Sequence, residues 1–190
     1  MNVVLIGFMA SGKSSVGRRV ARRLGYRFLD TDRFIESELG CTVAELFATK
    51  GEAYFRELEF RLARRLSALT NTVIATGGGM PAAPGNLAAL KAAGIVVFLN
   101  AAVEEIVQRL ERDTRRPKVQ GGELKDKVLH LHAARLPLYA QADVIVDTAG
   151  KSVNRVAGDV IRLTAEALHA RTATAPAGAS PEAAAKPQTA

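Results

Sequence analysis

The sequence has no tryptophan and a single cysteine among its 190 residues. One thiol, Cys41, cannot form a disulfide within the chain, so a small domain held together by disulfides is excluded. No apolar run approaches the roughly 20 residues that a membrane-spanning helix needs. The N-terminal segment has no cationic stretch followed by a cleavage-like site. We therefore expect a cytoplasmic protein with no membrane partner.

Acidic residues are fewer than basic ones, which leaves a formal net charge of +7. Such an excess is found in nucleic-acid-binding proteins and also in enzymes with anionic substrates. Four arginines crowd one segment, at Arg18, Arg19, Arg22 and Arg23. No aromatic residues interleave with them to stack on bases, so we interpret them as the solvated face of a helix. We expect small anionic substrates, no nucleic-acid partner and, without an extra exposed apolar stripe, a monomer.

Short apolar runs alternate with amphipathic stretches along most of the chain, and the hydrophobic content of 48% is ample for one core. The pattern predicts strands near 2–6, 26–30, 72–76, 95–99 and 143–147. It predicts helices near 13–24, 32–39, 43–49, 52–69, 85–92, 102–112, 124–136 and 152–170. Alternation of this kind predicts an α/β fold of three layers, with helices on both faces of a five-stranded parallel sheet.

Two segments break this pattern. Residues 112–123 are polar and contain glycine, which is typical of a lid over an active site. Residues 171–190 are rich in Ala, Pro and Thr and predict a disordered tail after a single domain of residues 1–170. Within the domain, Thr42 and Glu45 predict a capping box, and Gly51 is expected to end that short helix in a left-handed turn.

The strongest motif is Gly-Phe-Met-Ala-Ser-Gly-Lys-Ser at 7–14, which reads G-x-x-x-x-G-K-S. An apolar strand precedes it and a helical pattern follows, so the loop leads into a helix N-terminus, where backbone N–H groups favour an anion. Lys13 is expected to reach the outer phosphates of a nucleotide. The Ser14 hydroxyl is expected to bind Mg²⁺. A purely structural glycine turn is the alternative.

Polar residues and glycines follow two further strands. Asp30 and Asp32 follow the second strand, and Gly77-Gly78-Gly79 follow the third. Because ligands of open parallel sheets sit beyond the carboxyl ends of the strands, all of these segments are expected to face one crevice. If the segment is extended, the two carboxylates point the same way; one can hold Mg²⁺ through water and the other can deprotonate an attacking hydroxyl. Alternatively, Asp32 only caps the helix that starts at Arg33.

Three arginines are candidates for binding carboxylate or phosphate groups, since the guanidinium fork binds both in bidentate fashion. Arg116 lies in the expected lid, and Arg135 lies just before Pro137. Arg56 lies near the start of a helix, where a cation gains nothing from the helix dipole. The alternatives are surface charges and, for Arg56, an ordinary helix ion pair with Glu59.

Taken together, these motifs resemble those of the shikimate kinase family, small kinases of the nucleoside-monophosphate-kinase group. The resemblance covers about residues 2–168. The matching segments are 7–14, 28–32, 51–59, 76–79, 116–117, 135–139 and 146–148. The resemblance implies transfer of the γ-phosphate of MgATP to the 3-hydroxyl of shikimate, in aromatic amino-acid biosynthesis. Two other possibilities are a related small-molecule kinase such as a gluconate kinase, and a non-catalytic ligand-sensing domain.

The resemblance also implies a role for particular residues. The catalytic residues would be Lys13, Asp32 and Arg116, and Mg²⁺ would be held by Ser14 and Asp30. ATP would contact Ala10, Ser11, Gly12, Lys13, Ser14, Ser15, Arg109 and Arg116, with Lys151 as a further candidate. Shikimate would contact Asp32, Arg56, Gly78, Gly79 and Arg135, the two arginines binding its carboxylate.

The chain departs from the family pattern at several positions. Ala10 stands where members usually have glycine, which matters if the backbone there needs a positive φ. Lys118 and Val119 follow Arg-Pro in the lid where two leucines are usual. Val153 lies near the place of a usual proline in the adenine loop. The lid departure bears on lid packing and closure.

Overall fold

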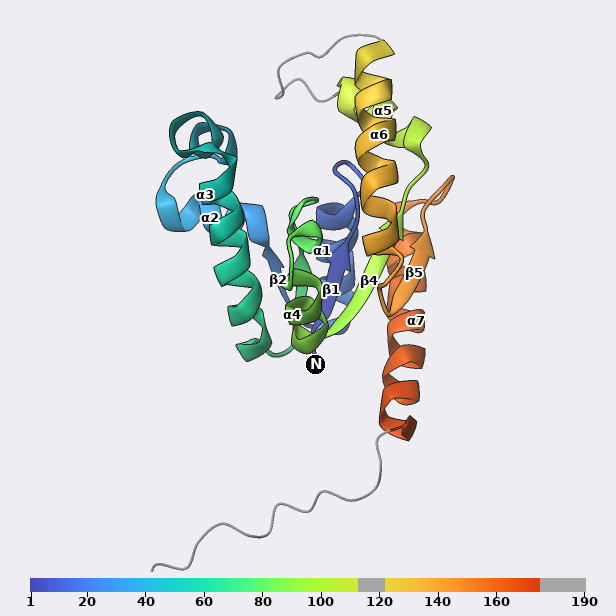
Figure 1. The fold of residues 1–190 in the computed structure, drawn as a ribbon. Helices are drawn as coiled ribbons and strands as arrows, with labels where there is room; N and C mark the ends of the chain where they lie inside the picture. The colour runs from blue at the N-terminus through green and yellow to red at the C-terminus, as the bar shows by residue number, and fades with distance from the viewer. Residues whose placement is uncertain (113–121, 175–190) are drawn as a thin grey trace, which may run out of the picture.

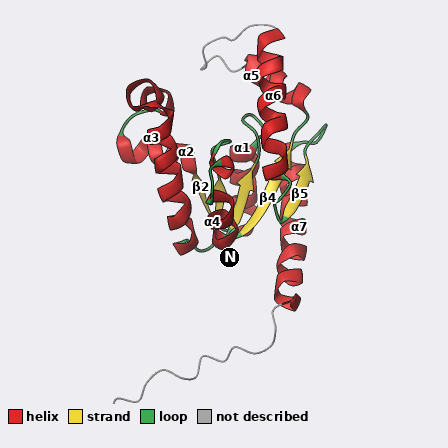
Figure 2. Cartoon of the chain, in the orientation of Figure 1, coloured by secondary structure: helices red, strands yellow, loops and turns green. Residues whose placement is uncertain are grey.

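The computed structural model describes residues 1–112 and 122–174. Five strands form one sheet in the order β2-β3-β1-β4-β5, and every neighbouring pair is parallel (Figures 1 and 2). The strands are β1 (Val3–Ile6), β2 (Arg27–Asp30), β3 (Thr72–Ala75), β4 (Ile95–Asn100) and β5 (Val144–Asp147). All five lie where the sequence pattern predicts them.

Helices connect the strands as expected, with small differences in extent. They are α1 (Lys13–Leu24), α2 (Thr31–Leu39), α3 (Val43–Arg65), α4 (Asn86–Ala93), α5 (Val103–Arg112), α6 (Gly122–Tyr139) and α7 (Val153–Thr174). Two 3₁₀ turns, Leu66–Ala68 and Met80–Ala82, were not predicted. The expected lid lies almost wholly outside the described residues, and so does the expected tail beyond residue 174. The α7 helix itself runs four residues past the predicted boundary at 170.

The two faces of the sheet are covered by different helices, which confirms the three-layer arrangement. Strand side chains alternate between the faces. Val4 and Ile6 of β1 lie in a cluster with apolar residues of α3, α4, α5 and α6, whereas Val3 and Leu5 pack against α1 and α7. The four residues of β1 are fully buried. A central strand covered on both faces explains why its sequence is continuously apolar.

Local signals set most of the helix boundaries. Thr42 forms the expected capping box at the start of α3, with Glu45 N–H donating to Thr42 Oγ1 at 3.2 Å. Gly51, with φ 80° and ψ 167°, is not helical, and α3 consists of two helices joined by a kink at this residue. The predicted break between helices at 43–49 and 52–69 is therefore confirmed, although the ψ of Gly51 differs from that of the left-handed turn that was expected.

The α6 helix continues past Pro137, where the sequence interpretation ended it. Pro137 lacks an N–H, so the carbonyl of Ala133 loses its helical hydrogen bond. Ala133 is exposed, and water can satisfy that carbonyl. The helix therefore carries Arg135 within its length and ends on the buried Tyr139. In the described ranges, no helix combines the length and the apolar content needed to cross a bilayer.

Candidate active site

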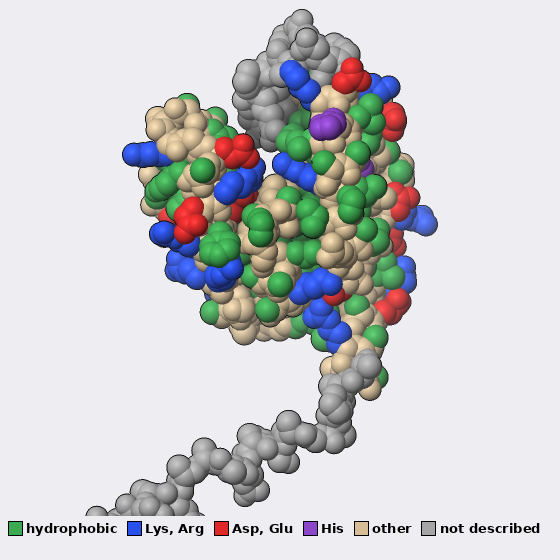
Figure 3. Space-filling model, viewed as in Figure 1, with side chains coloured by type: hydrophobic (Ala, Val, Ile, Leu, Met, Phe, Trp, Pro, Cys, Tyr) green, Lys and Arg blue, Asp and Glu red, His purple; other side chains and the backbone are tan. Residues whose placement is uncertain are grey.

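The loops at the carboxyl edge of the sheet gather the predicted site residues. Figure 1 shows the loop after β1, the start of α2 after β2, the glycine turn after β3 and the loop after β5 at the same end of the sheet. In Figure 3 the surface is hollowed between α3 and α6, and basic as well as acidic side chains border the hollow. This is the crevice expected where the strand order reverses from one side of β1 to the other.

The loop at 7–14 has the geometry of a phosphate cradle. Gly12, in a left-handed conformation with φ 95°, precedes α1, and the first turn of α1 has no acidic side chain and no side-chain cap. The Lys13 side chain bends back over the loop, and its Nζ donates to the carbonyls of Gly7 at 2.9 Å and Phe8 at 2.7 Å. The helix N-terminus and the ammonium group thus present positive charge at one place, which suits an anion.

A cavity of about 760 Å³ opens beside this loop. The residues predicted to contact ATP, so far as the structure describes them, all line it. They are Ala10, Ser11, Gly12, Lys13, Ser14, Ser15, Arg109 and Lys151. The rest of the wall is apolar, polar and basic, and consists of Val16, Leu110, Arg112, Thr148, Val153 and Val156. Arg116, predicted to close over the phosphates, lies outside the described residues.

Ala10 has a positive φ of 59°. This is the left-handed region, which costs a residue with a Cβ about 1–2 kcal/mol relative to glycine. The departure from glycine at this position therefore places strain in the phosphate loop itself. The loop holds this conformation because its neighbours fix it, with Ser11 N–H donating to Phe8 O at 3.2 Å and Arg109 donating to Ala10 O at 3.1 Å.

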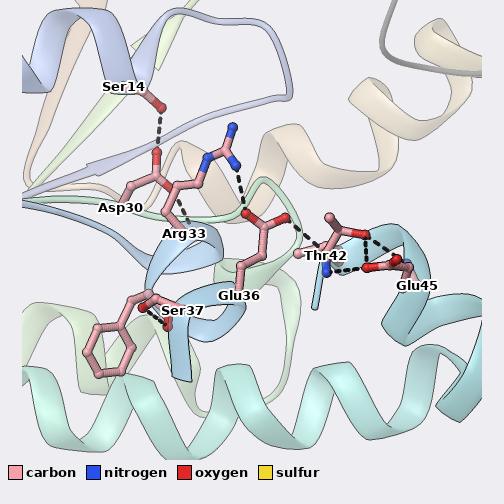
Figure 4. Close-up of polar contacts among 9 residues, drawn as sticks. Ser14, Asp30, Arg33, Glu36, Ser37, Thr42 and Glu45 are labelled. Atoms are coloured by element: carbon pink, nitrogen blue, oxygen red, sulfur yellow. Dashed lines mark hydrogen bonds and ion pairs between the residues drawn. The ribbon is translucent and has the colours of Figure 1, made fainter. Parts of the chain in front are cut away.

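The two residues predicted to hold Mg²⁺ touch each other. Ser14 Oγ donates to Asp30 Oδ2 at 2.6 Å (Figure 4). A hydroxyl and a carboxylate beside a phosphate cradle fit Mg²⁺, which takes few protein ligands and completes its shell with phosphate oxygens and water. Asp30 also caps α2, since its Oδ1 accepts from Arg33 N–H at 3.4 Å. The helix is therefore capped by Asp30, and the alternative interpretation, that Asp32 only caps it, is wrong.

Asp32 lies inside the first turn of α2. The expectation of an extended segment with both carboxylates on one side was therefore wrong, because the helix starts at Thr31, one residue before the predicted range of 32–39, and so includes Asp32. Asp32 Oδ1 is buried and makes no hydrogen bond. Burial is the main cause that raises the pKa of this carboxyl; Asp30 raises it further, and Lys13 and Arg56 oppose the shift. A buried acceptor without a donor is the type of group that a substrate hydroxyl satisfies.

Arg56 is held by two carboxylates on its own helix. Its guanidinium contacts Glu59 Oε2 at 2.6 Å and Glu52 Oε1 at 2.7 Å. The Glu59 side chain is fully buried, so this is no ordinary surface pair as the sequence suggested. Burial raises the pKa of Glu59 although Arg56 opposes the shift, and Glu59 Oε1 has no hydrogen-bond partner. Sequence reasoning missed Glu59 as a site residue. It could have been found because Glu59 lies four residues after Phe55, so that a charged residue falls on the apolar, buried face of the helix.

The glycine turn after β3 packs directly against these charged groups. A Cβ on Gly77 would lie 2.5 Å from Asp32 Oδ1 and 2.8 Å from Glu59 Oε1, and one on Gly79 would collide with the Arg56 guanidinium. Gly77 N–H donates to Thr31 Oγ1 at 2.8 Å. The turn therefore needs glycine for close approach: Gly77 lies against Asp32 and Gly79 against Arg56, whereas Gly78 lies against the backbone of the loop at 7–14.

Arg135 reaches the same crevice from α6. Its guanidinium lies 5.8 Å from the centre of the Phe8 ring, and it acts electrostatically on Glu59 and Tyr139. Tyr139, one turn further along, is buried and donates its hydroxyl to Gly78 O at 2.6 Å. This tyrosine belongs to the matching segment 135–139, but no role was predicted for it. The structure thus brings together the described substrate-site candidates on α2, α3, α6 and the glycine turn.

Comparisons with known proteins agree on one family. The family model described as shikimate kinase matches residues 9–165. A relative from Geobacter sulfurreducens named shikimate kinase is 45% identical over 165 residues, covering 87% of this chain and 91% of its own length.

Two solved structures extend the comparison. One is a shikimate kinase from Acinetobacter baumannii in complex with shikimate, which is 36% identical with a TM-score of 0.81 and covers 87% of this chain and 93% of its own. The other, a gluconokinase from Sinorhizobium meliloti, is 17% identical with a TM-score of 0.59, covering 91% of this chain and 97% of its own. At that identity the second structure is similar in fold alone.

Proposed function

This chain belongs to the shikimate kinase family, and we propose how its own residues carry out that family's reaction, transfer of the γ-phosphate of ATP to the 3-hydroxyl of shikimate. The observation that carries the proposal is the unpartnered, buried Oδ1 of Asp32, which lies near the ammonium of Lys13 and the guanidinium of Arg56. A base, a phosphate cradle and a cation for an acidic substrate therefore share one crevice.

The proposed transfer forms one bond and breaks another. The 3-hydroxyl oxygen attacks the γ-phosphorus, the bond between that phosphorus and the β,γ-bridging oxygen breaks, and ADP leaves with the bridging oxygen. The hydroxyl proton passes to the Asp32 carboxylate. Lys13 and the N-terminus of α1 neutralise the charge on the phosphates, which is the larger part of catalysis in phosphoryl transfer. Asp32 in this account both orients the hydroxyl and accepts its proton.

We propose that Arg56 and Arg135 bind the shikimate carboxylate from opposite sides, one from α3 and one from α6. Glu52 and Glu59 fix the guanidinium of Arg56, so little side-chain freedom is lost when the substrate binds. Gly78 and Gly79 approach the ring hydroxyls closely because no Cβ stands between the backbone and the substrate. Removing either arginine is expected to weaken substrate binding more than nucleotide binding.

We propose that Mg²⁺ accompanies ATP and is held by Ser14 and, through water, by Asp30. When bound, the ion supplies positive charge to the phosphate oxygens. Arg109 and Lys151 are proposed to contact the nucleotide, and both line the cavity beside the phosphate loop. Arg116 is proposed to close over the phosphates.

We propose that the protein acts in the cytoplasm as a monomer. Its ligands in this proposal are small molecules, with no nucleic-acid or membrane partner.

The experiment that tests this function is a coupled assay of ADP release. The purified chain with ATP and Mg²⁺ receives shikimate, gluconate or no acceptor, and Lys13→Ala serves as the control variant. We expect ADP release that depends on shikimate and is largely lost in Lys13→Ala. A higher kcat/KM with gluconate than with shikimate would mean that the protein is a gluconate kinase. Turnover no greater than that of Lys13→Ala would favour a ligand-sensing domain.

A further inference from the structure

Glu105 joins two walls of the nucleotide cavity. Its carboxylate oxygen Oε2 accepts from Arg109 Nη2 at 2.6 Å, and Oε1 accepts from the backbone N–H of Gly150 at 3.0 Å. Arg109 lies one turn further along α5, whereas Gly150 belongs to the loop after β5 and is 45 residues away in sequence. One side chain therefore bridges α5 and the loop that carries Lys151.

The same bridge reaches the phosphate loop through Arg109. Arg109 Nη1 donates to the carbonyl of Ala10 at 3.1 Å. The contacts run from Ala10 through Arg109 and Glu105 to Gly150, and so link three segments that are distant in sequence. Ala10, Arg109 and Lys151, the residue after Gly150, all line the nucleotide cavity. Neither the sequence motifs nor the family resemblance assigned a function to Glu105.

Glu105 does not line the cavity itself. A carboxylate facing a triphosphate would also repel it, so direct contact with the phosphates is disfavoured. Its action therefore passes through the groups that it holds. Gly150 has φ 64°, a left-handed turn whose outward N–H is fixed by the Glu105 oxygen. A helix i,i+4 ion pair would by itself be a minor surface feature, but here the second oxygen makes it a cross-link between elements.

On the basis of the proposed function, we propose that Glu105 is a positioning residue for ATP, holding Arg109 and the loop at Gly150 in the arrangement that accepts the nucleoside end of the nucleotide. Both of its bonds are charge-assisted, and such bonds fix geometry more firmly than neutral ones. Losing the cross-link leaves Arg109 and the loop with more conformations, which costs affinity for ATP.

The test compares Glu105→Gln and Glu105→Ala with the wild-type protein, and with Glu104→Gln as the matched control. Glu104 lies in the same turn of α5, is exposed, and its change removes the same charge from the same helix end. Binding of ATP is measured directly by calorimetry, and KM values for ATP and shikimate are measured by the coupled assay. Thermal midpoints report whether each variant remains folded.

We expect Glu105→Ala to raise the Kd and KM for ATP roughly 3- to 10-fold, as the loss of one or two hydrogen bonds implies. The KM for shikimate should stay within about 2-fold, Glu105→Gln should fall between Ala and wild type, and Glu104→Gln should match wild type. Unchanged ATP affinity in folded Glu105→Ala, an equal rise of both KM values, or an equal effect of Glu104→Gln would overturn the inference. If the wild-type chain itself failed to bind ATP, the proposed function would fail instead.

Discussion

At the scale of single residues, the phosphate loop contains a strained position. Ala10 has a positive φ of 59°, which glycine adopts without steric cost. Ala10→Gly should stabilise the folded protein by roughly 0.5–1 kcal/mol, because the relief of strain exceeds the added entropy of the unfolded chain. Urea unfolding of both proteins measures this change.

Ala53→Gly is the matched comparison for Ala10→Gly. Ala53 is exposed in the first turn of the helix after the kink at Gly51, where glycine should cost at most about 1 kcal/mol relative to alanine. The two substitutions are chemically identical and are expected to have opposite signs. If Ala10→Gly destabilised the protein as much as Ala53→Gly does, the strain assigned to Ala10 would be absent.

Glu59 is a buried acid whose titration affects stability. Burial raises its pKa above the ordinary value near 4.5. As pH rises between the unfolded and folded pKa values, the unfolded state has already lost the proton that the folded state keeps. The unfolded state therefore binds fewer protons, and stability falls as pH rises through that window. Glu59→Gln removes this term, so the variant should gain stability relative to wild type as pH rises.

Urea midpoints at a series of pH values from about 4 to about 8 measure this difference. Glu57→Gln is the control, since Glu57 is half-exposed on the same helix and pairs with Arg61 at the surface. We expect no comparable pH-dependent difference for the control. A relative loss of stability in Glu59→Gln with rising pH would mean that Arg56 outweighs burial and lowers the pKa of Glu59.

The residue types of the site could be predicted from the sequence, but their environments could not. The phosphate motif and the aspartates at the end of β2 depend on local order, which the sequence contains. The burial of Glu59 depends on how the α3 helix faces the glycine turn after β3, a contact between segments that are distant along the chain. The role of Asp30 as the cap of α2 depended on where the helix starts, which local propensity fixes only to within a few residues.

At the scale of elements, α6 is fastened to the glycine turn by one hydrogen bond. Tyr139 is buried against Phe98, with ring centres 5.1 Å apart, and its hydroxyl donates to Gly78 O at 2.6 Å. Tyr139→Phe keeps the ring and removes this donor, which leaves a carbonyl unsatisfied and costs about 1–3 kcal/mol. The bond ties α6, which carries Arg135, to the turn that contains Gly78. We therefore expect the KM for shikimate to rise several-fold in Tyr139→Phe, with the KM for ATP unchanged.

Steady-state kinetics with each substrate varied in turn measure the effect of Tyr139→Phe. Tyr26→Phe is the control, because Tyr26 is half-buried just before β2, at the opposite end of the sheet. An equal change in both KM values, or no change in a folded variant, would show that the bond does not position the substrate site.

The existence of every described strand and α-helix could be predicted from periodicity, but the two 3₁₀ turns could not, and the boundaries were predicted less well. The helix that contains Arg135 was predicted to end near residue 136, just before Pro137, and proline usually ends a helix. Here the carbonyl of the exposed Ala133, which has no N–H donor at Pro137, can bind water. Burial of Tyr139 favours continuation of the helix past Pro137. The packing of α6 against the sheet therefore outweighs a local signal that the sequence shows clearly.

At the scale of the whole molecule, the fold brings the candidate site residues together because they follow the carboxyl ends of neighbouring strands. The order β2-β3-β1-β4-β5 puts the phosphate loop after β1 at the centre of the sheet. The aspartates and the glycine turn lie on one side of that loop, and the nucleotide cavity with Arg109 and Lys151 lies on the other. Acceptor and nucleotide are therefore expected to meet over the phosphate loop, which is what a direct transfer between them requires.

The alternation of strands and helices was sufficient to predict a parallel sheet, but the order of its strands was not predicted and came only with the structure. Crossovers in such sheets are right-handed, yet several orders obey that rule. The bond from Glu105 to Gly150 likewise joins segments whose proximity no local pattern encodes.

The measurement that tests the central claim most directly is kcat for shikimate-dependent ADP release in Asp32→Asn, together with the Kd for ATP. The account predicts that kcat falls about 100-fold or more, the usual contribution of a general base, while ATP binding stays within about 2-fold of wild type. Asparagine keeps the size of the side chain and removes the charge that accepts the proton. A wild-type kcat in this variant would contradict the assignment of Asp32 as the base and, with it, the proposed mechanism.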